Sequence, residues 1–526
     1  MNNKRPLSGA ICSVIGTAIA GRLRRDSPCG IVPTIARRAR AEAALTWFAC
    51  AVVIAASNVT ALAQPNVNKA QFAQWGLEVF GRIENELKKS NSALYAQEVS
   101  LAGVQSGGAG GFAYVWPAGV QFRVLNALVR HNSATYTISQ RAYSNELLNR
   151  YWRSTSVGGY RSGVTTGSSV FYDDNAHIVI AEMDAYASTG DPIYLQRAEN
   201  TYDFVLRGED GVGGGGVWFQ ENVFVRKDSV STLQAARAAA ILYRATGQQS
   251  YLDDATRLLT WANSHVQQPD GLFQQGFNVS TNLPEGVELI NAAGMGISTN
   301  IELYKATRDP SYLTEAQRIA ARSISRYTDL NTTGRWNPAG QWAFELADAL
   351  VDLYPLDHLM SWTESLTSGL TYLHDIKADS NGHYGLRWGP PDDPPQPDPM
   401  TSWRLIDQAA VARAYLSVSQ IRQGLPGDYN EDGVVDAADY TIWRNNVGDS
   451  VVRLPNAFGA GAIGLEQYDL WRQQYGSELQ LGIGQGAIVP EPNSMALALI
   501  VTLFCRTRKK SQPFQDKSRC EPNAIA

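Results

Sequence analysis

Cysteine is scarce in this chain, and its placement excludes several kinds of site. The five cysteines among 526 residues stand near the two ends, at Cys12, Cys29, Cys50, Cys505 and Cys520. None falls between Cys50 and Cys505, so that stretch holds no thiol nucleophile, no zinc–thiolate centre and no disulfide framework. Histidine is also scarce, and the six histidines form no evident motif. Chemistry that depends on a cluster of thiols or catalytic histidines is therefore not indicated.

An excess of positive charge is missing as well. The chain has 45 Lys and Arg against 50 Asp and Glu, a formal net charge of −5 and a pI near 5.8. A nucleic-acid partner requires a basic face, so we expect no such partner. Aromatic residues are plentiful by contrast, with 13 Trp and 23 Tyr. Such rings serve as stacking platforms in sugar clefts, and they also fill ordinary cores.

The N-terminal segment 1–63 has the order of parts of a secretory signal. A basic group ending at Arg40 precedes an apolar run over 43–56, and Ala61-Leu62-Ala63 follows. A basic region, a short apolar core and an A-x-A site are typical of a cleaved signal peptide. We therefore expect export, with the mature chain starting at Gln64. The alternative is an N-terminal membrane anchor, which the short apolar run disfavours.

The C-terminal end also has the features of a targeting signal. Val489-Pro490-Glu491-Pro492 precedes an apolar stretch over 495–505 and a basic cluster ending at Lys510. This order over 488–510 resembles the PEP-CTERM sorting tail of exported bacterial proteins. The resemblance implies sorting machinery as a partner and a periplasmic, cell-surface or extracellular location. The extension 511–526 departs from it, and a chance hydrophobic tail is the alternative.

A recurring pattern organises the middle of the chain. Tyr194, Tyr251 and Tyr312 each follow a Thr-Gly or Thr-Arg turn and open a new apolar periodicity. Each copy is typical of a helix end, a tight turn and the start of the next helix. A spacing of about 60 residues suits a pair of long helices, and 64–424 has room for about six pairs. Six hairpins closing into a ring give an all-α (α/α)6 toroid; an open helical solenoid is the alternative.

The best chemical candidate is the pair Asp173-Asp174, which stands just before an amphipathic segment. Glycoside hydrolysis with retention uses a carboxylic acid and a carboxylate roughly 5 Å apart. Two close carboxylates also raise one another's pKa, so that one can stay protonated as the acid. A plain cap at a helix N-terminus is the structural alternative. Glu285 and Glu288 are lower-ranked candidates for the second carboxylate.

The segment around this pair resembles a known enzyme family. Asp173-Asp174-Asn175-Ala176 with its downstream turn resembles the active-site segment of glycoside hydrolase family 76. The similarity continues in Gly215-Gly216-Val217-Trp218 and in Pro269-Asp270-Gly271-Leu272, and covers most of 64–424. It implies an (α/α)6 barrel, endo-acting α-1,6-mannanase activity, a mannan-like polysaccharide as substrate and no cofactor for catalysis.

The resemblance also implies residue roles. It makes Asp173 the nucleophile and Asp174 the general acid/base. The candidate substrate-binding residues are Tyr172, Asn175, His177, Trp218 and Trp388. The family often has an aromatic residue where His177 stands. Its Tyr-Asn-Gln-Gly segment appears here as Asn291-Ala292-Ala293-Gly294, which keeps only the glycine.

A twelve-position calcium loop follows Pro426, within a segment 427–477 of different character. Its predicted ligands are Asp428, Asn430, Asp432, Val434 through its carbonyl, Asp436 and Asp439. Oxygen donors at these spacings, with Gly433 at the sharp turn, wrap around one hard cation. The aspartate at position 12 resembles dockerins, small EF-hand-like modules, more than EF-hand sensors. We therefore expect one structural Ca²⁺.

A partial second copy of this motif lies 28 residues further on. Tyr440 corresponds to Tyr468 and Trp443 to Trp471, but the loop 456–467 has lost most of its oxygen ligands. The duplicated helices still resemble a dockerin pair, which implies a cohesin-like protein partner. A purely structural role at the end of the chain is the alternative.

These observations predict an exported retaining glycoside hydrolase that cleaves α-mannan or a related polysaccharide. Two other enzyme classes with (α/α)6 barrels, sugar epimerases and unsaturated-glycuronide hydrolases, are alternatives. A non-catalytic glycan-binding scaffold protein is a further alternative from a different class.

Overall fold

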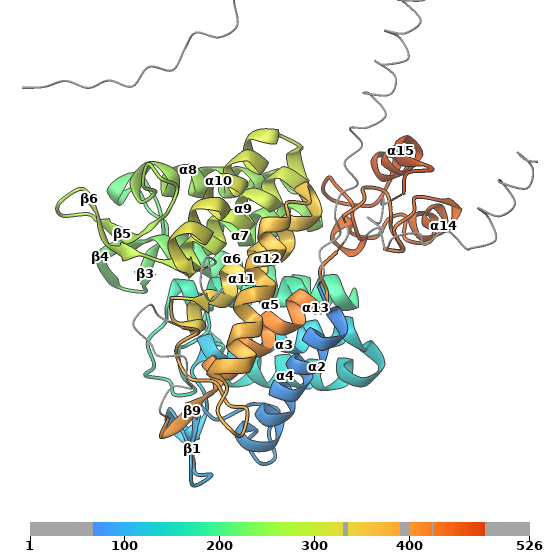
Figure 1. Cartoon of the computed structure of the whole chain (residues 1–526). Coiled ribbons are helices and arrows are strands. Elements are labelled where there is room, and N and C mark those ends of the chain that lie inside the picture. Colours follow the sequence, from blue (N-terminus) through green and yellow to red (C-terminus); the bar gives the residue numbers. More distant parts are fainter. Residues whose placement is uncertain (1–66, 330–334, 390–399, 423, 479–526) are drawn as a thin grey trace, which may run out of the picture. The chain divides into compact units, whose positions relative to one another are not determined.

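A computed structural model describes residues 67–329, 335–389, 400–422 and 424–478 (Figure 1). The predicted signal region and the predicted sorting tail lie outside these residues, and so do all five cysteines. Within the described residues, no helix combines the length and the apolar composition that a membrane crossing requires.

Twelve helices of the described residues form two concentric rings. The inner ring contains α3 (Val115–His131), α5 (Tyr172–Thr189), α7 (Ser229–Thr246), α9 (Ile290–Thr307), α11 (Gly340–Asp357) and α13 (Leu405–Ser419). The outer ring contains α2 (Lys69–Arg82), α4 (Ser133–Tyr151), α6 (Pro192–Leu206), α8 (Gln249–His265), α10 (Pro310–Tyr327) and α12 (Met360–Tyr372). Each inner helix contacts the next, and α13 contacts both α3 and α2. The ring is therefore closed: the predicted (α/α)6 toroid is confirmed, and the open solenoid is wrong.

Burial separates the two rings. The inner helix α13 is buried at almost every position, because neighbours surround it on all sides. The outer helix α10 buries only Ala316, Ile319, Ala320, Ser323, Ile324 and Tyr327, at spacings of three and four. Such a stripe covers one face of a helix. A helix that is buried on all sides therefore occupies the inner ring, and a helix with one buried face occupies the outer ring.

The recurring turns of the sequence connect inner to outer helices, as predicted. Gly190 and Gly247 end α5 and α7 in the left-handed conformation, with φ of 72° and 73°. Arg308 takes the same place after α9, with φ of 61°. Asp191 and Asp309 then cap the next helices through their side chains, ahead of a proline in the first turn. These are standard stop and start signals.

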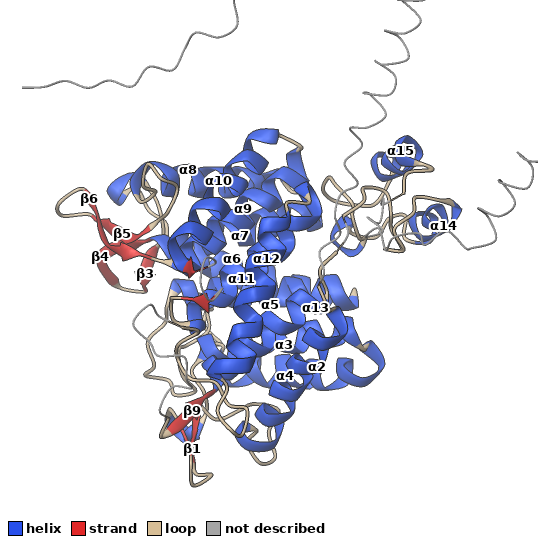
Figure 2. Cartoon of the chain, in the orientation of Figure 1, coloured by secondary structure: helices blue, strands red, loops and turns tan. Residues whose placement is uncertain are grey.

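Short antiparallel strands precede several inner helices (Figure 2). The strands are β1 (Glu98–Ser100), β2 (Gln105–Ser106), β3 (Trp218–Gln220), β4 (Val223–Asp228), β5 (Gln274–Asn278), β6 (Leu283–Glu288), β7 (Thr328–Asp329), β8 (Arg335–Trp336) and β9 (Ser402–Arg404). They pair as β2-β1-β9, β3-β4-β5-β6 and β7-β8. Strands β4, β6 and β9 lead directly into α7, α9 and α13. Glu285 and Glu288 therefore lie on strand β6.

A small helical unit follows the toroid in sequence. It contains α14 (Ala437–Asn445) and α15 (Leu465–Gln474). The Trp443 indole donates to the Gly464 carbonyl at 2.9 Å, and the Trp471 indole donates to the Asp436 carbonyl at 2.7 Å. Both acceptors are N-cap residues 28 positions apart. The two indoles thus make equivalent contacts, which shows that the sequence duplication is also a structural one.

Candidate active site

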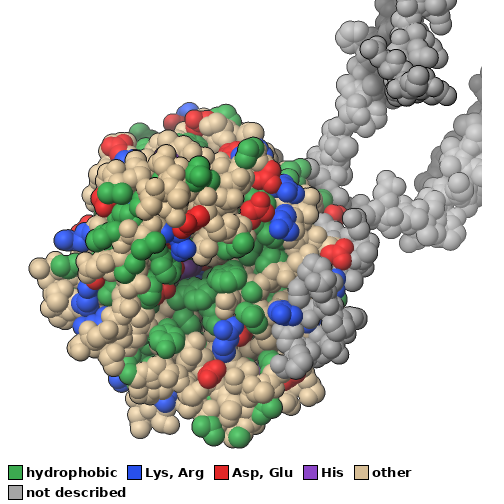
Figure 3. All heavy atoms as spheres, turned by 90° about the vertical axis from the view of Figure 1, so that its left-hand side faces the viewer, with side chains coloured by type: hydrophobic (Ala, Val, Ile, Leu, Met, Phe, Trp, Pro, Cys, Tyr) green, Lys and Arg blue, Asp and Glu red, His purple; other side chains and the backbone are tan. Residues whose placement is uncertain are grey.

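The first turns of the inner helices meet at one end of the toroid. This end includes Asp173 at the start of α5, and Asp228, which caps α7 and lies close enough for its charge to act on Asp173. Figure 3 shows the molecule from the side on which Figure 1 draws the strands. Its surface is hollowed there, with hydrophobic side chains around the hollow and a histidine at its base. The arrangement is that of a substrate cleft.

Asn175 holds the aspartate pair in place. It accepts a hydrogen bond from the Tyr160 backbone N–H at 2.6 Å and donates to the carbonyls of Tyr160 and Phe171. Phe171 is the N-cap of α5 and has no side-chain acceptor of its own. Asn175 therefore ties the start of the helix to the preceding loop. The predicted substrate-binding residue Asn175 is buried, and in this structure its amide serves the backbone.

The electrostatics of the pair favour protonation. Burial raises the pKa of Asp174 to about 7. The pKa of Asp173 is raised well above its usual range by burial first, and then by the charges of Asp174 and Asp228. The Asp174 backbone N–H donates to Asp173 Oδ1 at 2.8 Å, which opposes this shift only in part. Two carboxyl groups in such a site hold a proton near neutral pH, as an acid catalyst requires.

Three aromatic residues predicted to bind substrate are packed in the interior instead. Tyr172 stacks on Phe204, with ring centroids 5.1 Å apart. Trp218 is 2% exposed and donates to Asp210 Oδ2 at 2.9 Å. Trp388 is also 2% exposed. A ring with no open face cannot stack on a sugar, so packing explains these three residues better than substrate contact does.

More accessible aromatic residues lie at the starts of other inner helices. Tyr114 precedes α3 and is 49% exposed, and Trp342 in the first turn of α11 is 36% exposed. These are better candidates for stacking platforms. Sequence reasoning missed Tyr114, because only the position of the helix start brings it to the cleft.

Side chains of the inner helices fill the interior of the toroid in layers, and each layer contains residues at the same distance from the helix starts. In α5, α7 and α11 the sixth residue is His177, Gln234 and Glu345, and these three side chains meet. In α3, α7, α11 and α13 the ninth residue is Arg123, Arg237, Asp348 and Arg413. Distance from the helix start therefore sets depth below the cleft. Sequence reasoning found His177 but not the residues around it.

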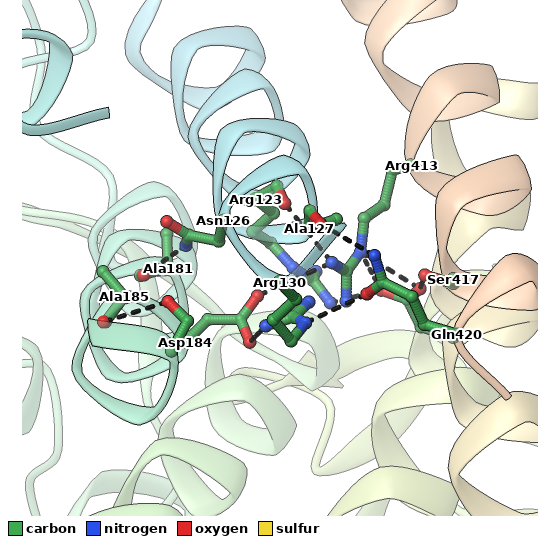
Figure 4. Close-up of polar contacts among 12 residues, drawn as sticks. Arg123, Asn126, Ala127, Arg130, Ala181, Asp184, Ala185, Arg413, Ser417 and Gln420 are labelled. Carbon is green, nitrogen blue, oxygen red and sulfur yellow. Dashed lines mark hydrogen bonds and ion pairs between the residues drawn. The ribbon is translucent and has the colours of Figure 1, made fainter. Parts of the chain in front are cut away.

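The ninth-residue level is a buried charge network. Arg123 pairs with Glu345 at 2.7 Å and with Asp348 at 2.5 Å, and Arg413 pairs with Asp348 at 2.9 Å. Figure 4 shows this network continuing one level deeper, where Asp184 joins Arg130 and Arg413. Such buried charges are tolerated because each is paired. They hold the inner helices in register beneath the cleft.

His177 lies between the aspartates and this network. Its side chain is 5% exposed, with Nδ1 at 3.5 Å from Glu345 Oε1. Burial lowers the pKa of His177 to about 4; Glu345 opposes the shift, and Arg123 and Arg237 add to it. The ring is therefore neutral at neutral pH.

Glu285 and Glu288 make contacts of their own. Asn278 donates to Glu285 Oε2 at 2.8 Å, and Arg326 pairs with Glu288 at 3.1 Å. Asp228 is the further carboxylate that the structure brings to Asp173. It was missed because it stands 55 positions downstream, at the start of another helix.

The predicted calcium loop has the expected backbone form. Asp428 Oδ2 accepts from the Gly433 N–H at 2.9 Å, and Asp439 Oδ1 accepts from the Tyr429 N–H at 2.7 Å. Gly433 has φ of 91°, the sharp turn that glycine was expected to provide. Burial, followed by the charges of Asp439 and Asp432, raises the pKa of Asp428 to about 6. Among the described residues, no three His, Cys, Asp or Glu side chains form a ready metal cluster.

Comparison with known proteins agrees with the fold. Residues 86–336 match the model of glycosyl hydrolase family 76. A family 76 α-mannanase of Bacteroides thetaiotaomicron superposes with a TM-score of 0.61 and 24% identity, over 66% of this chain and 95% of that one. An inactive variant of an α-1,6-mannanase of Salegentibacter sp. superposes with a TM-score of 0.55 and 17% identity, over 67% of this chain and 100% of that one.

The fold alone is shared more widely. A cellobiose 2-epimerase of Spirochaeta thermophila superposes with a TM-score of 0.52 and 13% identity, over 68% of this chain and all of that one. No curated protein sequence matches the chain. The match to the family model distinguishes between these neighbours: residues 86–336 are similar to glycosyl hydrolase family 76, and the protein is a glycosidase.

Proposed function

We propose that this protein is an exported, retaining α-mannanase that cleaves α-1,6-mannosidic bonds. The observation that carries the proposal is the pair Asp173-Asp174 in the first turn of α5. The pair lies at the end of the toroid where the inner helices begin, within the residues that match the family 76 model. The pair combines proximity with a raised pKa at Asp174, the two properties that a nucleophile and its neighbouring general acid need.

The proposed reaction has two steps. The Asp173 carboxylate attacks the anomeric carbon while the Asp174 carboxylic acid protonates the departing glycosidic oxygen. The C–O bond breaks and a glycosyl ester forms on Asp173. Asp174, now a carboxylate, removes a proton from water, which attacks the same carbon and releases Asp173. Net retention follows from the two inversions.

The solved mannanases support this choice of substrate and of residues. The Salegentibacter protein was crystallised with α-1,6-mannotriose as an inactive variant in which two adjacent aspartates are replaced by asparagine. Asp173 and Asp174 are the adjacent pair in the first turn of an inner helix here. The cleft has the aromatic residues Tyr114 and Trp342 at its edge, which suits a sugar chain.

We also propose one structural Ca²⁺ in the loop from Asp428 to Asp439. The donor set of carboxylates, one amide and one backbone carbonyl is the kind that calcium prefers. The ion would offset the charges that crowd around Asp428. In the second loop, Gln467 Nε2 donates to the Phe458 carbonyl at 2.8 Å, so a neutral amide closes the loop where a carboxylate would bind the ion. The second loop is therefore expected to stay free of metal.

The proposed location and partners rest on sequence alone. The signal-like segment 1–63 and the tail 488–510 support export and sorting at the cell envelope. The duplicated helices α14 and α15 support a cohesin-like partner.

Product analysis tests the activity. Incubation with linear α-1,6-mannan should release mannooligosaccharides, and NMR of the fresh product should show the α-anomer first. An epimerase would change the sugar at an end without shortening the chain, and a binding scaffold would do neither.

A further inference from the structure

Below the catalytic aspartates lies a buried group of side chains that the reaction scheme leaves without a role. It consists of His177, Gln234 and Glu345, the sixth residues of three inner helices. His177 stands four residues after Asp173, so the two side chains lie on one face of α5. The group is therefore the floor beneath the reacting pair.

Glu345 fixes the orientation of the Gln234 amide. Arg123 and Arg237 lie 2.7 Å and 3.2 Å from its two oxygens and, although burial opposes them, keep the pKa of Glu345 below its usual value. A carboxylate only accepts hydrogen bonds. Gln234 must therefore turn its NH2 group toward Glu345 Oε1, 3.4 Å away.

This orientation decides which nitrogen of His177 carries the proton. The Gln234 NH2 group lies 3.0 Å from His177 Nδ1 and donates to it. Nδ1 is then an acceptor, and the proton of the neutral ring sits on Nε2. The histidine thus presents an N–H donor on the side away from Gln234.

A buried polar atom without a partner lies near His177. The Trp116 ring lies 6.5 Å from that of His177, and Trp116 Nε1 has no hydrogen-bond partner in the part of the chain that the structure describes. Buried polar atoms are rarely left unpaired in folded proteins, so a ligand or an ordered water is expected to satisfy this one.

We propose that His177 binds a hydroxyl group of the sugar that lies against Asp173 and Asp174, with Gln234 and Glu345 as positioning residues. His177 donates through Nε2–H to the hydroxyl oxygen, and the fully buried Gln234 holds the ring in this tautomer. A deoxygenated carbon cannot accept this hydrogen bond. This inference rests on the proposed function, and it makes the floor a determinant of sugar specificity.

Kinetics of the full-length protein test the contact. His177→Phe keeps an aromatic ring without hydrogen bonds, and His177→Gln keeps an N–H near the position of Nε2. The first should lower kcat/KM about 10- to 100-fold and the second less than about 10-fold. Gln234→Leu removes the donor to Nδ1 and should also lower kcat/KM, because the proton is then no longer held on Nε2. The control His131→Phe, at the exposed end of α3, should match the wild type.

Monodeoxy substrates sharpen this test. Removing the contacted hydroxyl should slow the wild type by a similar factor and slow His177→Phe no further, because the interaction is already lost. A folded His177→Phe protein with wild-type kcat/KM would overturn the proposal and leave the floor a packing element, with at most a buried water.

The tautomer provides a readout that does not depend on substrate. In protein labelled with ¹⁵N-histidine, the His177 signal, identified by its loss in His177→Phe, should show the proton on Nε2. Glu345→Gln should produce a mixture of tautomers. A proton on Nδ1 in the wild type would refute the role of Glu345. If the wild type cleaves no mannan while Nε2 carries the proton, the substrate proposal fails and the positioning of His177 stands.

Discussion

At the scale of single residues, the site holds two adjacent carboxyl groups where their ionisation is unfavourable. Asp173 and Asp174 are ionisable groups held close together and partly out of water, with Asp228 nearby. In return the pair holds a proton at a pH where an isolated aspartic acid would be ionised. Two measurable consequences follow for this pair.

The first consequence is a pH limit on activity. The general acid must be protonated, and burial raises the pKa of Asp174 to about 7. Activity should therefore fall as pH rises through about 7, and it should also fall at acid pH, where the nucleophile Asp173, whose pKa is raised as well, becomes protonated. A profile of kcat/KM against pH measures this. A profile that stays flat up to pH 9 would show that neither aspartate donates the proton.

The second consequence concerns stability. The folded state binds these protons more tightly than the unfolded state does, so stability decreases as pH rises from about 4 to about 7. Asp174→Asn removes that cost and should raise the melting temperature at pH 8 by a few degrees. At pH 4 the variant and the wild type should melt together. Equal melting temperatures at both pH values would contradict the raised pKa.

The sequence identified the aspartates but not the fate of their neighbours. Asp173-Asp174 is visible as a local motif, and the resemblance covers it. Burial is a property of the assembled ring, so Tyr172, Trp218 and Trp388 looked like stacking platforms and proved to be packed. Tyr114 and Trp342 remain open because the inner helices begin next to them.

At the scale of helices and strands, the ends of helices differ in how clearly the sequence marks them. Asp191-Pro192 and Asp309-Pro310 mark the starts of outer helices through a cap and a proline. The inner helices α5, α9, α11 and α13 begin after Phe171, Leu289, Ala339 and Arg404, none of which caps with its side chain. The starts of these helices were therefore hard to predict from the sequence. The side chains that meet in the interior were equally hard to predict, because the helix start decides which residues lie at the same depth.

A glycine at a helix contact gives a prediction at this scale. A Cβ atom at Gly294 of α9 would lie 2.6 Å from the backbone of Glu345 in α11. Gly294→Ala gains about 1 kcal/mol of helix propensity but forces two inner helices apart, which costs about 1–3 kcal/mol or more. The variant should therefore be less stable in chemical denaturation, and less active because Glu345 moves.

Gly81 in α2 is the matched control. A Cβ atom there meets nothing within 4 Å, so Gly81→Ala should gain about 0.5–1 kcal/mol of stability. A stable and fully active Gly294→Ala protein would mean that the inner ring is looser than the structure shows.

At the scale of the whole molecule, closure of the ring explains why the site could be only partly predicted. Contact between α13 and α3 brings the two ends of the toroid's sequence together, and Arg413 and Arg123 then share Asp348. Arg123 and Arg413 are about 290 positions apart in the sequence. The hairpin repeat could be read from local periodicity, but pairings of this range depend on the closed ring.

Calcium gives a prediction for the C-terminal unit. Titration of the metal-free full-length protein should reveal one bound Ca²⁺ per chain, since the second loop is closed by the Gln467 amide. Asp428→Ala should abolish binding, and Asp469→Ala, which removes an exposed carboxylate on α15, should leave it unchanged. Two ions per chain would show that the second loop binds metal after all.

The central claim is the proposal that Asp173 and Asp174 make this protein a mannanase. The most direct measurement is hydrolysis of linear α-1,6-mannan by the full-length protein beside Asp173→Asn and Asp174→Asn. We predict mannooligosaccharide release by the wild type and a loss of about 10³-fold or more in each variant, without loss of folding. Release that persists in both folded variants would contradict the assignment of the catalytic pair, and no release by the wild type would contradict the substrate.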